Sequence, residues 1–359
     1  MSRPALLDKL FQAGEWLLKP SLVPVDDVTI KRNQTAVYVA LDALIRQGGG
    51  LAVGQDKRIY VDFSLMPTDA FEELLKSIRV PVWLTKNLTI YVATTGSDML
   101  DEGRGLTQDK PFATLQAALN YAADTYNISS YHVTINVAAG NYVVPGKYIT
   151  LPQYNAGTGE IQIVGASADY SQTVIGGIRS VFSSTYTFRN LTIKNDMTAT
   201  GAAVWSMLVE DGDISLYNVA LDSTEITSSG IITALLAQGG RVQILGTTGD
   251  PCGLHIKPQA NQTYLVRCGN AYIGVTADII VDSEVTVSGA ALDVQELGIF
   301  SISQSVSATT PGRYPLFSGP VTGKRYTCSG NAVINTRGAG PDVIPGTIAG
   351  TLSNGGQYI

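Results

Sequence analysis

A strand-like pattern, in which two apolar residues flank one other residue, recurs along the chain between residues 133 and 302. Seven such strand cores follow one another at nearly constant intervals of about 25 to 29 residues. The first residues of these cores are Val133, Ile161, Tyr186, Ile214, Val242, Ala271 and Phe300. A spacing this regular indicates stacked repeats, each of which covers the exposed edge of the one before.

Turn residues recur with the same spacing. Four of the cores have a glycine two residues before their first apolar residue, at Gly212, Gly240, Gly269 and Gly298. This position suits a tight turn with backbone angles that other residues rarely adopt. Asn190 and Asn218 are also one period apart, each two residues after a core. Stacked asparagines can hydrogen-bond to each other and to turn backbone groups, so we expect an asparagine ladder there.

A period of this length favours one kind of repeat architecture. Propeller blades need four strands and about 40 residues or more, whereas a solenoid coil needs two or three short strands. We therefore predict a right-handed parallel β-helix of an all-β-dominated chain, with rungs roughly 4.8 Å apart. In this register Ile214, Val242 and Phe300 must all point inward.

The residues before the repeat show helical patterns. Helices are expected over residues 4–18, 36–46, 70–78 and 112–126, with strands at 58–63 and 88–92. Asp109 is the expected N-cap of the last helix, with Pro111 in its first turn, and this helix could cover the open end of the strand stack. The expected organisation is an N-terminal helical attachment segment (1–50), a neck (51–86), the β-helix (87–338) and a glycine-rich C-terminal segment (339–359).

Charge and composition exclude several classes of function. The net charge of −6 leaves no basic face for nucleic acid or for an anionic membrane. Three cysteines, Cys252, Cys268 and Cys328, have no metal-ligand or disulfide-framework spacing, so we expect neither a metal nor another cofactor. The N-terminus shows no secretory signal, and no apolar run reaches the ~20 residues that span a bilayer. A role outside the cell would then need another route of delivery, such as release within virions.

Several segments resemble one family. The sequences of Ile90–Asp98 and Gly105–Ala118 resemble the entry of pectin-lyase-like β-helices in phage tail fibres and tailspikes. The segments Gly48–Val92, Thr336–Gly350 and Gly355–Tyr358 are also similar to tail-fibre sequences of phages and prophages. The resemblance implies a homotrimer, attached through its N-terminus to a phage tail or baseplate protein, that recognises bacterial surface polysaccharide. Some members of the family also cleave the polysaccharide.

Cleavage by hydrolysis usually needs two carboxyl groups a few ångströms apart. Lys194, Asp222 and Asp250 recur at the interval of the repeat, which would stack the two aspartates on neighbouring rungs. Asp282 and Glu284 would lie about 6.7 Å apart on one strand face. Turn contexts around Asp222 and Asp250, and an exposed polar face at Asp282 and Glu284, make structural roles the favoured interpretation of these weak catalytic candidates.

Sugar binding calls for outward aromatic rings among polar groups. Trp205, Tyr217 and Tyr272 are the candidates for receptor contact, although packing between protomers would use such rings equally well. His132 and His255 are isolated in the sequence and are interpreted as structural. We therefore expect a receptor-binding tail fibre or tailspike in the virion, made in the host cytoplasm. The alternatives are a polysaccharide depolymerase (glycoside hydrolase) on the same β-helix and a structural shaft without a receptor site.

Overall fold

The computed structural model describes residues 50–53, 59–62, 82–154, 157–246, 252–303 and 315–359. Two compact units divide the chain, Met1–Val82 and Trp83–Ile359. In the first unit, β1 (Gly50–Val53) pairs antiparallel with β2 (Ile59–Asp62), the strand expected at 58–63. The helices expected over 4–18, 36–46 and 70–78 lie outside the described residues.

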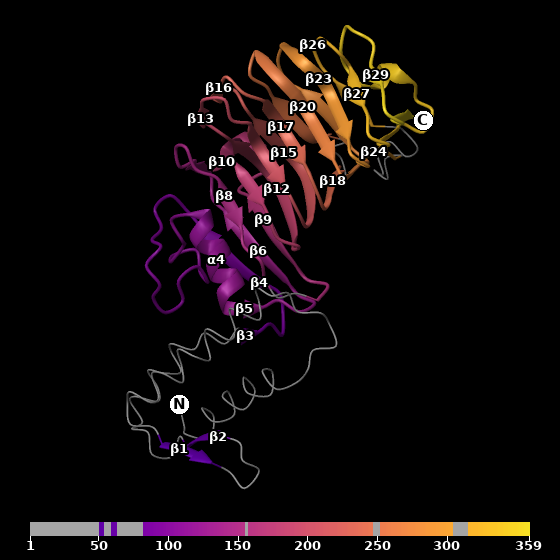
Figure 1. The fold of residues 1–359 in the computed structure, drawn as a ribbon. Coiled ribbons are helices and arrows are strands. Elements are labelled where there is room, and N and C mark those ends of the chain that lie inside the picture. Colours follow the sequence, from indigo (N-terminus) through magenta and orange to yellow (C-terminus); the bar gives the residue numbers. More distant parts are fainter. Residues whose placement is uncertain (1–49, 54–58, 63–81, 155–156, 247–251, 304–314) are drawn as a thin grey trace. The chain divides into compact units, whose positions relative to one another are not determined.

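The second unit is a parallel β-solenoid of about 7 turns, which confirms the predicted β-helix (Figure 1). Its strands form three lengthwise faces. The first face holds β4 (Leu88–Val92), β6 (His132–Val137), β9 (Glu160–Gly165), the first halves of β12 (Thr185–Lys194) and β15 (Asp213–Asp222), β18 (Arg241–Leu245), β21 (Tyr272–Val275), β24 (Ile299–Ile302), β28 (Val333–Asn335) and β30 (Gln357–Tyr358).

The other two faces complete each coil. The second face holds β7 (Gly140–Tyr142), β10 (Thr173–Gly176), the second halves of β12 and β15, β19 (Cys252–Lys257), β22 (Asp278–Val281) and β25 (Phe317–Ser318). The third face holds β8 (Ile149–Leu151), β11 (Ile178–Ser180), β14 (Val204–Val209), β17 (Ile232–Ala237), β20 (Asn261–Gly269), β23 (Val285–Gln295), β26 (Val321–Thr322), β27 (Tyr326–Cys328) and β29 (Thr351–Leu352). Shorter elements are β3 (Val82–Trp83), β5 (Tyr126–Asn127), β13 (Thr198–Ala199), β16 (Thr227–Ser228) and the 3₁₀ turns η2 (Tyr170–Gln172) and η3 (Pro341–Val343).

The apolar cores of the first face stack as predicted, with one shift of register. Ile214, Val242 and Phe300 are at most 1% exposed, so all three point inward. Val242 pairs with Ile273, however, and not with Ala271. Because side chains alternate between the two sides of a strand, a shift by two residues keeps the same face inward. The predicted register of this rung was therefore wrong by two residues, but the prediction of which residues point inward was right.

The asparagine ladder is confirmed and forms the corner between the first and second faces. The amide nitrogen of Asn218 donates to Oδ1 of Asn190 at 3.0 Å and to the carbonyl of Ala168 at 2.6 Å. Both asparagines have left-handed backbones, with φ of 55° and 51°. Asparagine tolerates this conformation better than most residues, so each can bend a long strand from one face to the next.

Three of the four expected turn glycines have a structural reason, whereas Gly269 has neither a positive φ nor a close neighbour for an added Cβ. Gly212 and Gly240 have positive φ, as predicted. Near the other two glycines the left-handed residues are Asn270 and Leu297. A Cβ on Gly298 would lie 2.7 Å from the carbonyl oxygen of Cys268, so this glycine allows a close approach of rungs.

Among the described residues one α-helix, α4 (Leu115–Thr125), lies at the β4 end of the solenoid (Figure 1). Its apolar face is buried, and its N-cap is Thr114, not Asp109 as predicted, because the Thr114 side chain accepts from the Ala117 amide. Gln116 covers the outer edge of β8, since its side-chain amide exchanges two 2.9 Å hydrogen bonds with the Thr150 backbone. The helix thus satisfies groups that an edge strand would leave unpaired.

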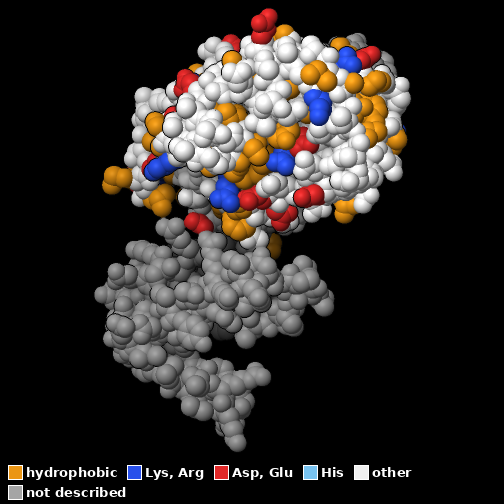
Figure 2. Space-filling view, turned by 45° about the horizontal axis from the view of Figure 1, so that its top comes forward, with side chains coloured by type: hydrophobic (Ala, Val, Ile, Leu, Met, Phe, Trp, Pro, Cys, Tyr) orange, Lys and Arg blue, Asp and Glu red, His pale blue; other side chains and the backbone are white. Residues whose placement is uncertain are grey.

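The C-terminal segment at 339–359 joins the solenoid. Within it, β29 pairs with β27 and β30 pairs with β28, both in parallel. In the described part of the chain no helix is long and apolar enough to cross a bilayer. The surface seen in Figure 2 is mostly uncharged, and its acidic and basic side chains are interspersed.

Candidate functional site

The expected stacking of Asp222 on a second aspartate is not seen at the rungs next to Asp222. In register, Asp222 lies between Lys194 and Lys257, so its neighbour on the following rung is a lysine. Asp250 lies outside the described residues. One carboxylate oxygen of Asp222 accepts from both the amide and the hydroxyl of Thr224, which is the hydrogen bonding of a turn aspartate.

Asp282 and Glu284 do not share a strand face as expected. They lie in the turn between β22, which ends at Val281, and β23, which begins at Val285. Glu284 is exposed. Asp282 instead contacts His255, with Oδ1 2.9 Å from Nδ1 of the imidazole. The predicted pairing of two carboxylates is thereby replaced by a histidine–aspartate pair.

We call the group formed by Tyr170, His255, Lys257 and Asp282 the His255 cluster. The rings of Tyr170 and His255 have centroids 4.5 Å apart, and the Lys257 ammonium lies 5.1 Å from the centre of the Tyr170 ring. The Tyr170 hydroxyl is 3.5 Å from Oδ2 of Asp282. Sequence reasoning missed this cluster, although the separation of His255 and Asp282 along the chain matches one period of the repeat.

Two of the predicted receptor aromatics are already in contact with other side chains. The Arg189 guanidinium lies 3.7 Å from the centre of the Tyr217 ring. Trp205 stacks on Tyr148 at 5.8 Å between ring centroids. The Tyr148 hydroxyl donates to the Trp205 carbonyl, and burial raises the pKa of this phenol above its usual value. Both rings therefore contribute to local packing on the solenoid surface.

Tyr272 lies at the start of β21 on the outside of the first face, and like Tyr217 it has an arginine of the preceding rung over its ring, at a longer distance. Its register neighbours are Arg241 and Ile299, and the Arg241 guanidinium carbon lies 5.6 Å from its ring centre. A Cβ on Gly274 would lie 2.8 Å from this ring. The tyrosine thus lies along its own strand over the space that glycine leaves open.

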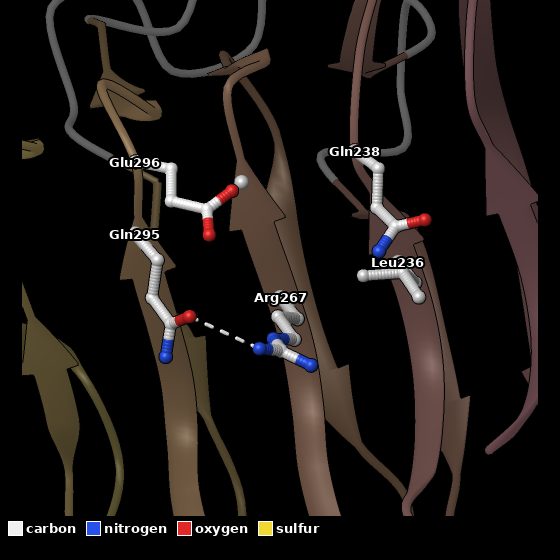
Figure 3. Close-up of a pocket in the computed structure, with 6 residues that line it drawn as sticks. Leu236, Gln238, Arg267, Gln295 and Glu296 are labelled. Carbon is white, nitrogen blue, oxygen red and sulfur yellow. Dashed lines mark hydrogen bonds between the residues drawn. The ribbon is translucent and has the colours of Figure 1, made fainter. Parts of the chain in front are cut away.

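An open pocket of about 90 Å³ lies where third-face strands turn toward the first face. We call it the corner pocket, and Figure 3 shows Gln295 and Glu296 reaching toward Arg267 on the neighbouring strand, with Leu236 and Gln238 on the strand beyond. Its lining residues are Leu236, Gln238, Arg267, Gly269, Gln295 and Glu296. Tyr272 follows Gly269 by three residues in sequence and begins β21, the first-face strand that comes after this corner.

The Arg267 guanidinium is held in place from beneath the corner pocket. Its Nε lies 2.9 Å from Oδ2 of Asp293, a side chain with no exposed surface. Another guanidinium nitrogen donates to Oε1 of Gln295 at 3.0 Å. The other Asp293 oxygen accepts from Gln295 and from Thr327. A guanidinium fixed at two edges is pre-organised to donate to a ligand with little loss of side-chain entropy.

Glu296, on the rim of the corner pocket, has an unusual backbone. Both Glu296 and Leu297 have left-handed φ, of 52° and 66°. The Leu297 amide donates to the Gly330 carbonyl and the Gly298 amide donates to the Gln295 carbonyl, so the next rung holds the turn in this conformation. Strained backbone of this kind persists only where the surrounding structure holds it, and it is found mostly at binding and catalytic sites.

Polar and charged side chains of the corner pocket suit a neutral, hydroxyl-rich ligand. Arg267 and the two glutamine amides offer donors, Glu296 and the amide oxygens offer acceptors, and Leu236 adds an apolar surface. The described residues contain no group of three or more His, Cys, Asp or Glu side chains arranged to hold a metal ion. Comparison with protein-family models, with curated proteins and with solved structures found no match to this chain.

Proposed function

We propose that this chain is the receptor-binding protein of a phage tail, a tail fibre or tailspike that attaches the virion to bacterial surface polysaccharide. The resemblance of residues 90–118 to the entry of tailspike β-helices supports the class of protein. In the structure these residues form β4, the following loop and the first turn of α4, which stand at the start of the solenoid. The proposal includes a homotrimer whose N-terminal segment docks on a tail or baseplate protein.

The corner pocket, together with Tyr272, is the observation that carries the polysaccharide proposal. Hexoses present vicinal hydroxyls at their edges and apolar C–H groups on their faces. A fixed guanidinium and paired amides suit the edges, and an outward tyrosine ring suits a face. All these groups stand on a rigid strand lattice, so little ordering is required when a glycan binds.

Binding of purified protein to a panel of bacterial capsules and lipopolysaccharides tests the proposal. We expect retention on at least one glycan, and Tyr272→Ala should weaken it about fivefold per site, the equivalent of ~1 kcal/mol of stacking. Tyr91→Ala is the matched control, because Tyr91 is a partly buried, outward tyrosine on β4 of the same face. A loss of binding that is equal in the two variants would contradict the assignment of the site.

The oligomeric state is tested separately. Light scattering should give three times the chain mass of 38.0 kDa, since closed symmetry hides edges and joins three weak sites into one tight attachment. A monomer at micromolar concentration would contradict the trimer. Glycan binding by a monomer would leave the polysaccharide proposal standing without the assembly.

A further inference from the structure

The His255 cluster has the arrangement of a catalytic base with its orienting group. Asp282 Oδ1 contacts Nδ1 of His255 at 2.9 Å, and the two side chains are 24% and 17% exposed. A carboxylate in this position favours the tautomer with its proton on Nδ1. Nε2, on the opposite side of the ring, is then the basic nitrogen available to a water molecule.

The fold supplies the cluster from three elements: His255 and Lys257 lie on β19, Tyr170 lies in η2 and Asp282 follows β22. His255 lies on β19 between Ala220 and Ile280 in register. The Asp282 amide donates to the Ile256 carbonyl, which places Asp282 beside Lys257 on the neighbouring rung. Three elements thus converge on one patch of the second face. Backbone pairing between rungs fixes the positions of His255 and Asp282, so their contact does not depend on side-chain conformation alone.

Tyr170 is held just as firmly. It begins η2, whose N-cap Asp169 accepts from the Ser171 amide and hydroxyl, and these hydrogen bonds hold the pKa of Asp169 below its usual value. The Thr192 hydroxyl donates to the Tyr170 carbonyl. The phenol oxygen therefore stays near Asp282, 3.5 Å from Oδ2. A substrate oxygen can take the place of Asp282 as the acceptor of this long contact.

Glycosidic-bond hydrolysis does not suit this cluster, because it needs a second carboxylate opposite the first. Asp282 is already paired with His255, and Glu284 lies in an exposed turn. Elimination from a uronate does not suit it either, because that reaction needs a cation to neutralise the sugar carboxylate. Lys257 has Asp222 as its neighbour in register and Asp282 as its neighbour on the next rung, so two carboxylates would compete with that of a uronate for this cation.

We propose that the His255 cluster hydrolyses O-acyl esters, such as O-acetyl groups, on the polysaccharide that the protein binds. This inference rests on the proposed function, since it takes the bound glycan as substrate. A histidine oriented by a carboxylate activates water for attack on an acyl carbon, and a nearby hydroxyl can donate to the oxyanion that forms. The cluster supplies both groups.

The reaction uses only water and the ester. As the water oxygen bonds to the acyl carbon, His255 Nε2 takes one water proton and the carbonyl π electrons move onto oxygen, where the Tyr170 hydroxyl donates to them. When the carbonyl re-forms, the bond from the acyl carbon to the sugar oxygen breaks. The imidazolium returns its proton to that sugar oxygen, which leaves a free hydroxyl and a carboxylic acid. Asp282 and Lys257 act as positioning residues for His255 and Tyr170.

Ester hydrolysis by the full-length protein tests the inference, first with p-nitrophenyl acetate and then by acetate release from the acetylated glycan found in the binding screen. We expect His255→Gln to lower kcat at least about hundredfold, the usual contribution of a general base. His132→Gln is the matched control, because it removes the only other histidine of the chain, and it should leave the rate unchanged. Asp282→Asn should lower kcat with KM unchanged, whereas general loosening of the fold would change both, and Tyr170→Phe should also slow the reaction.

The outcomes separate this inference from the proposed function. Equal rates for wild type and His255→Gln, with both folded by circular dichroism and both still binding glycan, would overturn the esterase and leave receptor binding intact. His255-dependent hydrolysis of the small ester without binding to any glycan would support the chemistry and count against the proposed function. Unsaturated uronate products in place of acetate would overturn the ester assignment in favour of elimination.

Discussion

The ion pair beneath the corner pocket should be one of the most sensitive points of the solenoid. Arg267→Met keeps much of the apolar stem but removes the charge that faces Asp293. The Asp293 side chain has no exposed surface, while that of Arg267 is 24% exposed, so the substitution leaves a buried carboxylate without its cation. Removing one partner of a buried pair typically costs about 3–5 kcal/mol.

The structure places the expected cost at the lower end of this range. Gln295 and Thr327 both donate to the second Asp293 oxygen and would continue to do so after the substitution. We therefore expect Arg267→Met to lower the free energy of unfolding by about 3 kcal/mol. Adding Asp293→Asn removes the buried charge, so the double variant should recover about half of this loss or more.

Equilibrium unfolding in guanidinium chloride measures these differences, with refolding from denaturant as the check of reversibility. If unfolding proves irreversible, unfolding rates in denaturant replace the equilibrium values. A loss below about 0.5 kcal/mol for Arg267→Met would refute the reasoning, since it would mean that Asp293 is hydrated or uncharged in the folded protein. A double variant less stable than Arg267→Met would refute it as well.

Other contacts of the solenoid lead to three more predictions. Asn218→Ala should lower the free energy of unfolding in guanidinium chloride by about 2–3 kcal/mol, because it removes two hydrogen bonds and leaves alanine in a left-handed backbone. Asn218→Gly should recover about 1 kcal/mol of this, because glycine accepts the same φ. Equal losses would show that the backbone is not strained. Gly274→Ala should displace the Tyr272 ring and weaken glycan retention, because the three atoms nearest to the added Cβ all belong to that side chain. The melting temperature should stay within a few degrees, and unchanged retention would place the receptor site elsewhere. Burial raises the pKa of the Cys268 thiol to about 12, so folding favours the neutral thiol: the stability gained is complete below the unfolded thiol pKa of about 8.5 and is lost as pH rises toward 12. Melting temperatures between pH 8 and pH 10 should therefore fall more for wild type than for Cys268→Ala, and parallel curves would contradict this assignment.

The solenoid could be predicted from the sequence because two physical requirements of each rung produce a repeating pattern of residues. Each rung must place apolar side chains inward, and each corner needs residues that tolerate left-handed backbone. Both requirements recur at Ile214 and Val242 and at Asn190 and Asn218. The sequence did not reveal how many residues each corner absorbs, so the register of the Ile273 rung was placed two residues away from its observed position.

The two candidate sites could not be predicted in the same way. Tyr170 and Asp282 are 112 residues apart in sequence. The strands β12, β15 and β19 lie between β10, which follows Tyr170, and β22, which precedes Asp282. The two residues meet because the loop that carries Tyr170 reaches past the neighbouring rung, where the Ala168 carbonyl accepts from Asn218 of β15. The aspartates at 222 and 250 were expected to be neighbours from a constant period, but the observed neighbour of Asp222 is Lys257. Local sequence thus determined which residues face inward and where the chain turns. Only tertiary stacking decided which outward side chains meet, because corner lengths accumulate along the solenoid and set the register of every later rung.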